Sequence, residues 1–310
     1  MNSPASRFSP SNHPPPSTDE KSTIAIVICT RSHPLQLRKC LEAVAQLVPA
    51  ADEILVVDNT PGDKETEVVA REFEAHYTRE PVAGLSRARN RALNECGSDV
   101  VAFLDDDATP TKGWLKNILK PFDDPTVASV TGDTFPPGAV PDGVPDLPRS
   151  LTNKDPQWFE IATFGGLGVG TNMALRKAFC AGWTVFDERL GRGAPLWIAE
   201  ENHAFAVLLS RGYRAVHVPA AIVIHPMKPR NIELEASTSF AYWLLLFCEF
   251  PGHRLDLLQF LLRRLRRKPL TWPRDPQGPG EVITSGWRMH LKAGWAGGRL
   301  YLRARKLKGK

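Results

Sequence analysis

The sequence predicts an α/β protein with a mostly parallel central sheet that is flanked by helices. Short apolar, β-branched segments alternate with segments whose apolar residues recur at helical spacing, as in successive βαβ units. The 310 residues are 42% hydrophobic and 24% charged, which excludes a wholly disordered or collagen-like chain. From residue 234 onward the pattern is helical. We therefore expect a Rossmann-like core followed by a helical C-terminal extension.

The first half of the chain supplies the alternating elements. Residues 23–29 (TIAIVIC) are apolar on both faces, as in a strand that is covered on both sides. Pro34 is a favourable start for a helix at 35–48. Further strands are expected at 53–57, 76–79 and 99–104, and further helices at 63–75 and 86–95. This order is typical of parallel strands joined by right-handed crossovers.

The regular alternation of expected strands and helices ends after residue 112. We expect a helix at 112–122, a strand at 127–134 and a loop rich in proline and glycine at 135–148. A glycine-rich stretch at 165–170 (GGLGVG) leads into an expected helix at 172–181. A helix at 200–211 and two strands, 214–218 and 221–224, complete the pattern before the helical extension.

Charge is distributed unevenly along the chain. The formal net charge is +5, but residues 251–310 carry +12 and the other residues carry −7. A mildly acidic body with a basic tail suggests chemistry in one part and attraction to something anionic in the other. The five cysteines form no CxxC pair and are odd in number, which favours reduced thiols in a cytoplasmic protein.

Neither a targeting segment nor a spanning helix is expected. The first 22 residues are rich in proline, serine and charge, contain no apolar stretch, and are predicted to be disordered. No run reaches the 18 or so apolar residues of a membrane-spanning helix.

An acidic triplet is the strongest chemical signal. Asp105, Asp106 and Asp107 directly follow the apolar strand at 99–104. Open α/β sheets bind ligands at the carboxyl ends of their strands. The mutual repulsion of these carboxylates is relieved when a divalent cation lies between them, and Mg²⁺ or Mn²⁺ suits such ligands. The alternative is an acidic, solvated turn.

A second candidate lies at the start of the helix at 86–95. Arg89 and Asn90 belong to a helix N-terminus, whose free amides and dipole favour an anion. Arg89 could pair with a phosphate or hold a member of the triplet. A solvated basic helix face is the alternative for its neighbours Arg87 and Arg91.

Several motifs together resemble a family 2 glycosyltransferase with the GT-A fold. They are IVICTRSHP, ILVVDNT, GLSRARNRAL, FLDDDATP, GTNMALR and a late EE pair, in the expected order across residues 23–230. The resemblance implies an inverting, metal-dependent transfer from a nucleotide-diphosphate sugar, most often a UDP-sugar, to an acceptor hydroxyl. It also implies that the DxD-type pair is Asp105 and Asp107, with Asp106 as the other reading of the triplet.

The resemblance assigns roles to further residues. It implies base contacts at Thr30 and Arg31, and base or ribose binding at Asp58, for which a helix cap is the alternative. It places Asn172 in the segment that shapes the sugar and acceptor cleft, where the residue could also cap a helix. His225 would ligate the metal or contact the diphosphate, and a structural histidine is the alternative.

The Glu200–Glu201 pair stands where the family usually carries Glu-Asp. The resemblance implies that the second residue, Glu201, is the base that deprotonates the acceptor. Glutamate in place of aspartate, and the unusual Asn-His that follows, put the assignment of the base in doubt. The alternative is a pair of carboxylates that are favoured by the helix dipole.

The chain is expected to have three parts. These are a disordered segment at 1–22, a GT-A catalytic domain at 23–230 and a helical, basic extension at 231–310. In the extension, residues 240–250 and 255–267 combine apolar and basic residues, which predicts contact with an anionic membrane surface. We expect a peripheral protein on the cytoplasmic face and a saccharide or lipid-linked acceptor, as in the synthesis of cell-surface polysaccharide or glycolipid.

Two other classes of protein share part of this pattern. A sugar-phosphate nucleotidyltransferase shares the strand-end carboxylates, but the first loop (CTRSHP) lacks the glycines expected of that class. A nucleic-acid-binding protein could use the basic tail, but no recognition module is visible, and no nucleic acid partner is expected. The QxxRW motif of processive synthases of the resembled family is absent, which favours addition of a single sugar.

Overall fold

The computed structural model describes residues 22–59, 64–144, 146–227, 231–265 and 287–307. Within them, one mixed sheet has the strand order β3-β2-β1-β4-β8-β6-β9-β5, with β7 beside β9. The strands are β1 (Ile24–Thr30), β2 (Glu53–Asp58), β3 (His76–Arg79), β4 (Val100–Asp105), β5 (Thr109–Pro110), β6 (Val127–Phe135), β7 (Arg149–Leu151), β8 (Met173–Arg176) and β9 (Arg214–Ile224).

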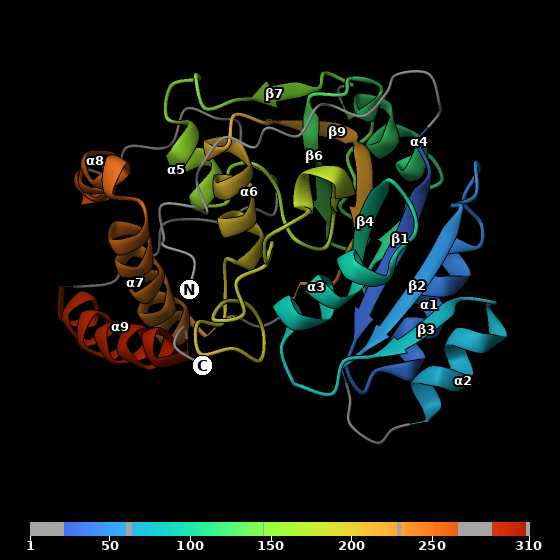
Figure 1. The fold of residues 1–310 in the computed structure, drawn as a ribbon, viewed down its shortest axis with the longest axis horizontal. Coiled ribbons are helices and arrows are strands. Elements are labelled where there is room, and N and C mark those ends of the chain that lie inside the picture. The colour runs from blue at the N-terminus through green and yellow to red at the C-terminus, as the bar shows by residue number, and fades with distance from the viewer. Residues whose placement is uncertain (1–21, 60–63, 145, 228–230, 266–286, 308–310) are drawn as a thin grey trace.

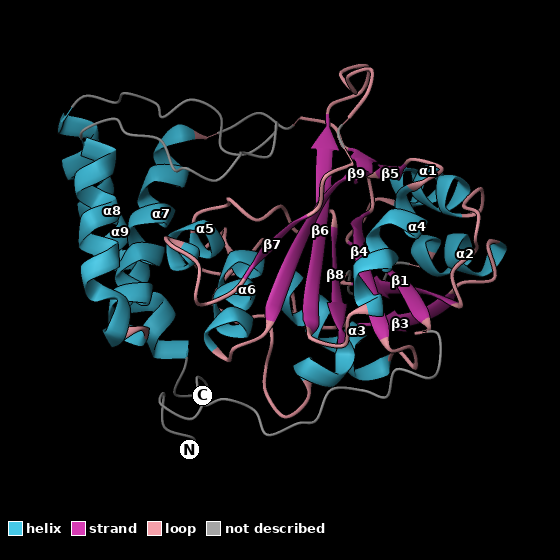
Figure 2. Cartoon of the chain, turned by 90° about the horizontal axis from the view of Figure 1, so that it is seen from above, coloured by secondary structure: helices cyan, strands magenta, loops and turns pink. Residues whose placement is uncertain are grey.

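Helices cover both faces of the sheet (Figures 1 and 2). They are α1 (Pro34–Val44), α2 (Glu65–Glu72), α3 (Leu85–Glu95), α4 (Trp114–Leu119), α5 (Trp158–Thr163), α6 (Glu200–Ser210), α7 (Ile232–Glu249), α8 (Arg254–Leu265) and α9 (Trp287–Leu307). The predicted α/β class, with a mostly parallel sheet and a helical C-terminal region, is confirmed.

Strands β3, β2, β1 and β4 pair with one another in parallel, as the sequence predicts. Alternate residues of β1 face opposite cores. Ala25 and Val27 pack with α3, whereas Ile26 and Ile28 pack with α1, α2 and α4. Burial on both faces explains why this strand is apolar throughout.

Residues 172–181 differ from the helix that the sequence predicts. Met173–Arg176 forms β8, which pairs antiparallel with β4 and β6, and a short 3-10 helix (Lys177–Cys180) follows. All four residues of β8 are buried. A short apolar run has no periodicity that separates a buried strand from a helix, so the two neighbouring strands decide its conformation.

The two strands expected at 214–218 and 221–224 are one continuous strand, β9. Its register with β6 shifts between Gly132 and Thr134. A Cβ atom at Gly132 would collide with the backbone oxygen of Ala221. Glycine at this position therefore permits the close approach of the two strands.

The C-terminal helices share the core of the sheet. Tyr242, Leu245 and Leu246 of α7 and Ala304 of α9 belong to the same buried cluster as Phe103 of β4. The apolar stretch 240–250 therefore packs mainly inward and is not exposed as a whole to a membrane. No helix in the described ranges is long and apolar enough to cross a membrane. The expected disordered segment, apart from Ser22, lies outside the described residues.

Candidate active site

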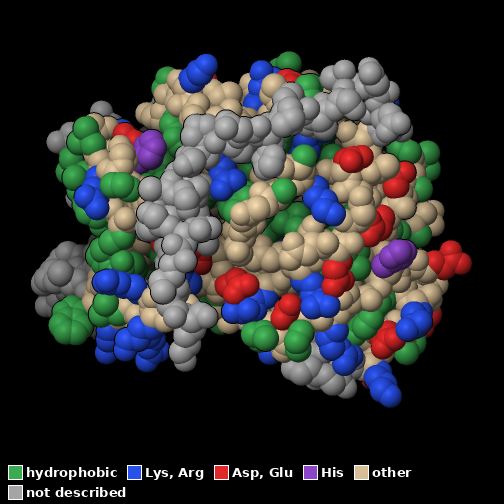
Figure 3. All heavy atoms as spheres, in the orientation of Figure 1, with side chains coloured by type: hydrophobic (Ala, Val, Ile, Leu, Met, Phe, Trp, Pro, Cys, Tyr) green, Lys and Arg blue, Asp and Glu red, His purple; other side chains and the backbone are tan. Residues whose placement is uncertain are grey.

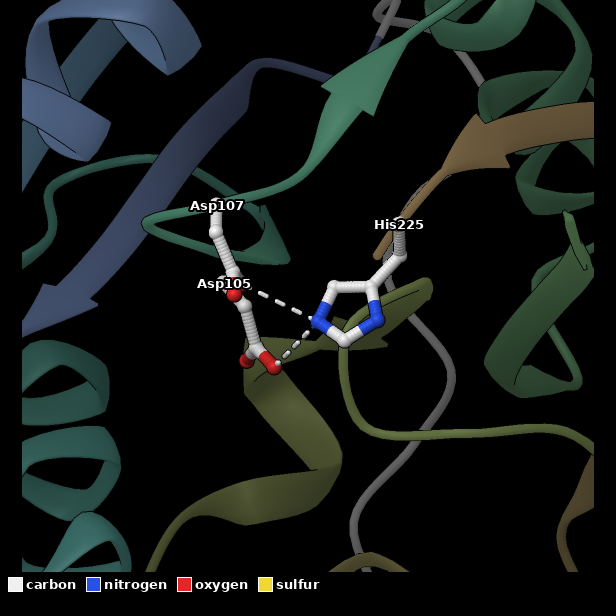
Figure 4. A group of neighbouring side chains, drawn as sticks. All are labelled: Asp105, Asp107 and His225. Carbon is white, nitrogen blue, oxygen red and sulfur yellow. Dashed lines mark ion pairs between the residues drawn. The ribbon is translucent and has the colours of Figure 1, made fainter. Parts of the chain in front are cut away.

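The acidic triplet lies at the carboxyl end of β4, where its members point in different directions. Asp106 turns toward β1, where its carboxylate accepts a hydrogen bond from Thr30 Oγ1 (2.6 Å) and lies 3.0 Å from His33 Nδ1. Asp105 and Asp107 instead point toward His225, which directly follows β9 (Figure 4). The fold thereby separates the outer carboxylates of the triplet from the central one.

Asp105, Asp107 and His225 form a compact set of potential metal ligands. Nε2 of His225 lies 3.0 Å from Asp107 Oδ1 and 3.4 Å from Asp105 Oδ2. One ligand atom from each residue lies within 4.8 Å of the others. Burial would lower the pKa of His225, but the two carboxylates outweigh it and raise this pKa to about 9. The two carboxylates suit Mn²⁺ or Mg²⁺ in donor chemistry, and the imidazole offers a nitrogen ligand beside them.

Arg89 connects this carboxylate group to α6. Its guanidinium is buried, and it donates to Glu200 Oε1 (2.8 Å) and to the carbonyl oxygen of Gly170 (3.0 Å). Asp105 Oδ1 lies 3.6 Å from the same guanidinium. Burial opposes the charge of Arg89, but the carboxylates of Glu200 and Asp105 raise its pKa. The positive charge of Arg89 therefore links Glu200 in the first turn of α6 to Asp105 at the end of β4.

The Glu200–Glu201 pair occupies the first turn of α6. Ala199 precedes the helix with a φ of 71°, in the left-handed region, and turns the chain into it. Glu200 is buried against Arg89, whereas Glu201 is partly exposed. Partial burial and the charge of Glu200 raise the pKa of Glu201 to about 8. A carboxyl group with such a pKa can accept a proton near neutral pH.

Thr30 and Asp58 lie at the same sheet edge, because they are register partners in β1 and β2. Asp58 is fully buried, accepts a hydrogen bond from the hydroxyl of Tyr77 (2.8 Å) and lies 3.9 Å from Arg79. Arg31 is exposed in the loop that follows β1. These residues border the triplet on the side of β2.

The side chains of Asn172 and Asn90 are engaged in structural hydrogen bonds. Asn172 accepts from Trp114 Nε1 and donates to the carbonyl oxygens of Asp133 and Ala221, each at 2.8 Å. Asn90 donates to the carbonyl oxygen of Phe186 (2.8 Å) and accepts from the Phe186 amide (2.9 Å). The structure uses both amides to join segments, and it does not bring them to the carboxylate group.

A second buried polar cluster was missed by sequence reasoning. Arg189 donates to Asp187 (2.8 Å) and to Glu249 of α7 (2.8 Å), and Glu249 Oε2 lies 3.9 Å from Nε2 of His203 on α6. The four side chains are buried. Because Glu249 is 60 residues from Arg189, no local pattern indicates the contact.

The cluster adjoins the Glu200–Glu201 pair. Leu190 and Gly191 follow Arg189, and the Leu190 carbonyl oxygen accepts a hydrogen bond from Ser86 of α3 (2.7 Å). A Cβ atom at Gly191 would lie 3.0 Å from the Glu200 carboxyl group. The loop that carries Arg189 therefore packs directly against Glu200.

The architecture is similar to that of solved glycosyltransferases, so the fold is GT-A-like. The mannosyltransferase PcManGT of Pyrobaculum calidifontis, in complex with GDP-Man and Mn²⁺, aligns over 97% of this chain and 79% of its own, with 18% identity and a TM-score of 0.53. Glucosyl-3-phosphoglycerate synthase of Mycobacterium tuberculosis, in complex with Mn²⁺, UDP and glucosyl-3-phosphoglycerate, aligns over 76% and 85% of the two chains, with 19% identity and a TM-score of 0.51.

The chain belongs to glycosyl transferase family 2, whose model matches residues 25–181. It is 30% identical over 218 residues to glycosyltransferase AglE of Haloferax volcanii. This alignment covers 66% of this chain and 67% of the relative. It is 35% identical over 123 residues to the pre-mycofactocin glycosyltransferase of M. tuberculosis. That alignment covers 38% of this chain and only 25% of the longer relative. The predicted family is confirmed, and glycosyltransferase is the class of enzyme that this family and these relatives support.

Proposed function

We propose that the chain transfers one sugar from a nucleotide-diphosphate donor to an acceptor hydroxyl, with inversion and with a divalent metal. The observation that carries the proposal is the convergence of Asp105, Asp107 and His225 with Arg89 and the Glu200–Glu201 pair. These residues come from four segments and meet at one edge of the sheet in a chain of family 2.

The metal site would consist of Asp105, Asp107 and His225, and would hold Mn²⁺ or Mg²⁺. When bound, the ion neutralises charge on the leaving diphosphate. Arg89 holds Asp105 and Glu200 in place, since its guanidinium contacts both. Arg89 therefore acts through these carboxylates, and direct pairing of Arg89 with phosphate is the weaker hypothesis.

Glu201 is the proposed base. Its carboxylate takes the proton of the acceptor hydroxyl as the hydroxyl oxygen bonds to the anomeric carbon. The bond from that carbon to the diphosphate oxygen breaks on the opposite side, so the anomeric configuration inverts and nucleoside diphosphate leaves. Glu200 remains paired with Arg89 and keeps the start of α6 in position.

Thr30, Arg31 and Asp58 are the proposed contacts to the nucleoside, because they border the triplet at the ends of β1 and β2. The roles of Asp106, Asn90 and Asn172 would be to support the loops around the donor. Structural neighbours were solved with GDP-Man or with UDP. We propose a UDP-sugar as the donor and treat a GDP-sugar as the competing candidate.

A saccharide or a lipid-linked saccharide is the proposed acceptor, and no nucleic acid partner is proposed. Transfer at the cytoplasmic face of a membrane, by a peripherally attached protein, would then contribute to a cell-surface polysaccharide or glycolipid. The catalytic domain at 23–230 and the extension at 231–310 would divide these two tasks.

Thermal-shift measurements with nucleoside diphosphates test the donor and metal assignments. We expect UDP to raise the melting temperature only when Mn²⁺ or Mg²⁺ is present, because a ligand that binds the folded state stabilises it by mass action. Asp107→Asn should abolish this shift, and Asp123→Asn at an exposed surface position should retain it. An unchanged metal-dependent shift in Asp107→Asn would remove Asp107 from the proposed site.

Product analysis separates this proposal from a nucleotidyltransferase. A glycosyltransferase releases nucleoside diphosphate from the sugar nucleotide, whereas a nucleotidyltransferase forms or consumes pyrophosphate. Release of UDP or GDP that depends on an added acceptor is the expected result. Exchange of labelled pyrophosphate into a sugar nucleotide would favour the other class.

A further inference from the structure

Helices α7, α8 and α9 lie at the edge of the molecule farthest from β3 in both ribbon views (Figures 1 and 2), and α7 contacts both α8 and α9. The inner sides of both helices are well packed. On α8, Leu257 is fully buried and Phe260 stacks on Phe164 at 3.9 Å between ring centroids. Arg263 pairs with the buried Glu160 of α5. The orientation of α8 about its own axis is therefore determined by contacts with the body of the protein.

Helix α9 is also held in one orientation. A Cβ atom at Gly297 would lie 2.5 Å from the backbone oxygen of Ser237 on α7, so only glycine allows this close approach. Ala304, two turns later on the same side, is fully buried. The residues on the opposite side of α9 must consequently face away from the protein.

The outer side of α8 carries leucines. Leu255, Leu258 and Leu262 recur at i, i+3 and i+7, and their side chains are 65%, 44% and 51% exposed. This spacing places them on one stripe of the helix. Exposed leucines scattered singly are ordinary, but a stripe of them is typical of a contact surface.

The outer side of α9 combines an aromatic ring, a leucine and cations. Trp295, Arg299, Leu302 and Lys306 lie within about 60° of one another around the helix, opposite Gly297. Trp295 is 77% exposed and Leu302 is 55% exposed. Helix α9 contains no acidic residue, and Arg303 and Arg305 add to its exposed positive charge. Lys and Arg side chains gather over this part of the molecule in Figure 3.

We propose that the outer sides of α8 and α9 form a docking surface for an anionic lipid bilayer. The leucines and Trp295 enter the boundary between head groups and acyl chains, and the arginines and lysine contact anionic head groups. A nucleic acid would match the charge but would offer the leucines no apolar environment. The sequence predicts a membrane surface formed by residues 240–250 and 255–267. In the structure, most of residues 240–250 are packed inside the protein, and α9 lies at the surface beside α7 instead.

The inference deepens the peripheral location proposed above, and it does not depend on the transfer chemistry. A bilayer that contacts both helices would hold the catalytic body at a fixed height and angle. The acceptor class that suits such an arrangement is one that is itself anchored in the bilayer, with its reactive hydroxyl in the aqueous layer.

Vesicle sedimentation with the full chain tests the surface. We expect the protein to bind vesicles of phosphatidylcholine mixed with anionic phosphatidylglycerol, and to bind pure phosphatidylcholine vesicles much more weakly. Raising the salt concentration should weaken the binding, because exposed charges are screened. Absence of binding to the anionic vesicles at low salt would overturn the proposal.

Two double variants separate the charged from the apolar contribution. Arg299→Gln with Lys306→Gln should weaken binding about 25-fold, at roughly fivefold for each charge near the surface. Trp295→Ala with Leu302→Ala should weaken it about tenfold and should do so also at high salt. The matched controls, Lys112→Gln with Lys116→Gln and Leu35→Ala, alter exposed residues elsewhere and should bind as the unaltered protein does.

Two results would contradict the assignment. Equal losses in the controls would mean that binding is not specific to this surface. The second such result is that the protein forms a concentration-dependent dimer and that Trp295→Ala with Leu302→Ala abolishes the dimer but leaves vesicle binding unchanged. This result would assign the surface to contact with a second copy of the chain. The vesicle assay contains no donor, so its outcome is separate from the test of the proposed transferase reaction. In solution, the Trp295 variant should retain normal turnover of a soluble acceptor.

Discussion

Glu200 and Glu201 are adjacent in sequence but have different surroundings. The carboxylate of Glu200 is buried and bonded to Arg89, which commits it to a structural ion pair. The carboxyl group of Glu201 is partly exposed, and its pKa is raised to about 8. Surroundings that give two neighbouring carboxyl groups different pKa values are typical of active sites in which the two groups have different roles.

Glu201→Gln tests the proposed base. We expect kcat to fall about a hundredfold to ten-thousandfold, the usual contribution of a general base, with little change in the KM for the donor. The measurement is steady-state release of nucleoside diphosphate at saturating acceptor. Glu188→Gln removes a carboxylate that pairs with Arg87 at the surface and should leave kcat unchanged. Near-normal turnover in Glu201→Gln would assign proton removal to another group.

The pKa of Glu201 also predicts two pH dependences. As a base, Glu201 acts in its deprotonated form, so kcat/KM for the free enzyme should rise as the pH passes through about 8. For stability the sign is opposite. A pKa raised in the folded state stabilises the fold below the pKa of the unfolded chain, and this contribution is lost as the pH rises through about 8.

Denaturant unfolding at several pH values measures this second effect. The stability advantage of the unaltered protein over Glu201→Gln should decrease between mildly acidic pH and pH above about 8. A difference between the two proteins that is constant with pH would mean that Glu201 titrates normally.

Gly170 is a position where a single methyl group should matter. A Cβ atom there would lie 2.7 Å from Nη2 of Arg89, which is buried and bonded to Glu200. We expect Gly170→Ala to displace the guanidinium and to lower kcat by at least about tenfold, since small displacements of catalytic groups are costly. Gly113→Ala meets only an ordinary contact and is the control. Unchanged kcat with a folded Gly170→Ala protein would show that the Arg89 contact is not needed.

Among the secondary-structure elements, α6 and α7 are coupled through charge. Glu249 near the end of α7 pairs with Arg189, whose loop packs on Glu200 at the start of α6. A buried ion pair does not guarantee net stability, but removal of one partner leaves the other charge buried and poorly compensated. Helix α7 thus contributes to the geometry around the proposed base.

Glu249→Gln is expected to lower the free energy of unfolding by about 3 kcal/mol. It should also lower kcat more than it raises the KM for the donor, because the change reaches the site through Glu200. Urea unfolding and steady-state kinetics measure the two effects. Glu42→Gln on the exposed face of α1 should stay within about 0.5 kcal/mol of the unaltered protein. A stable Glu249→Gln enzyme with unaltered kcat would disprove the coupling.

At the level of the whole molecule, the C-terminal helices and the sheet share one apolar cluster. Leu245 and Leu246 of α7 are buried together with residues of β1, β4 and α6. The proposed parts, residues 23–230 and 231–310, therefore differ in their proposed functions but share one hydrophobic core. A core shared by both parts favours their unfolding in one cooperative step.

Hydrogen exchange under native conditions tests this cooperativity. We expect the slowest amides of α7 to open with the same free energy as those of β1 and β4, since all three line one cluster. A much lower opening free energy for α7 would identify the extension as a separate unit. Exposed amides of α2 provide an internal control for local fraying.

Much of the fold could be predicted because its signals are local. The alternation of strands and helices from β1 to β4 follows from apolar periodicity, and the carboxylates of the triplet follow β4 directly in the chain. Carboxyl ends of parallel strands meet at one sheet edge, so the place of Asp58 and the triplet was predictable as well. The motifs also indicated family 2, which the family model confirms.

Other features depend on partners that are distant in the chain. Residues 173–176 have no decisive local preference, and they form a strand because β4 and β6 provide hydrogen-bonding partners on both sides. The amide of Asn172 is engaged by Trp114 and Ala221, which lie 58 and 49 residues away. The link from Arg189 to Glu249 likewise exists only after α7 has packed against α6. The sequence by itself determines the features that depend on local residue spacing. Only the tertiary structure decides the contacts between distant residues, because burial requires separated polar groups to form hydrogen bonds with one another.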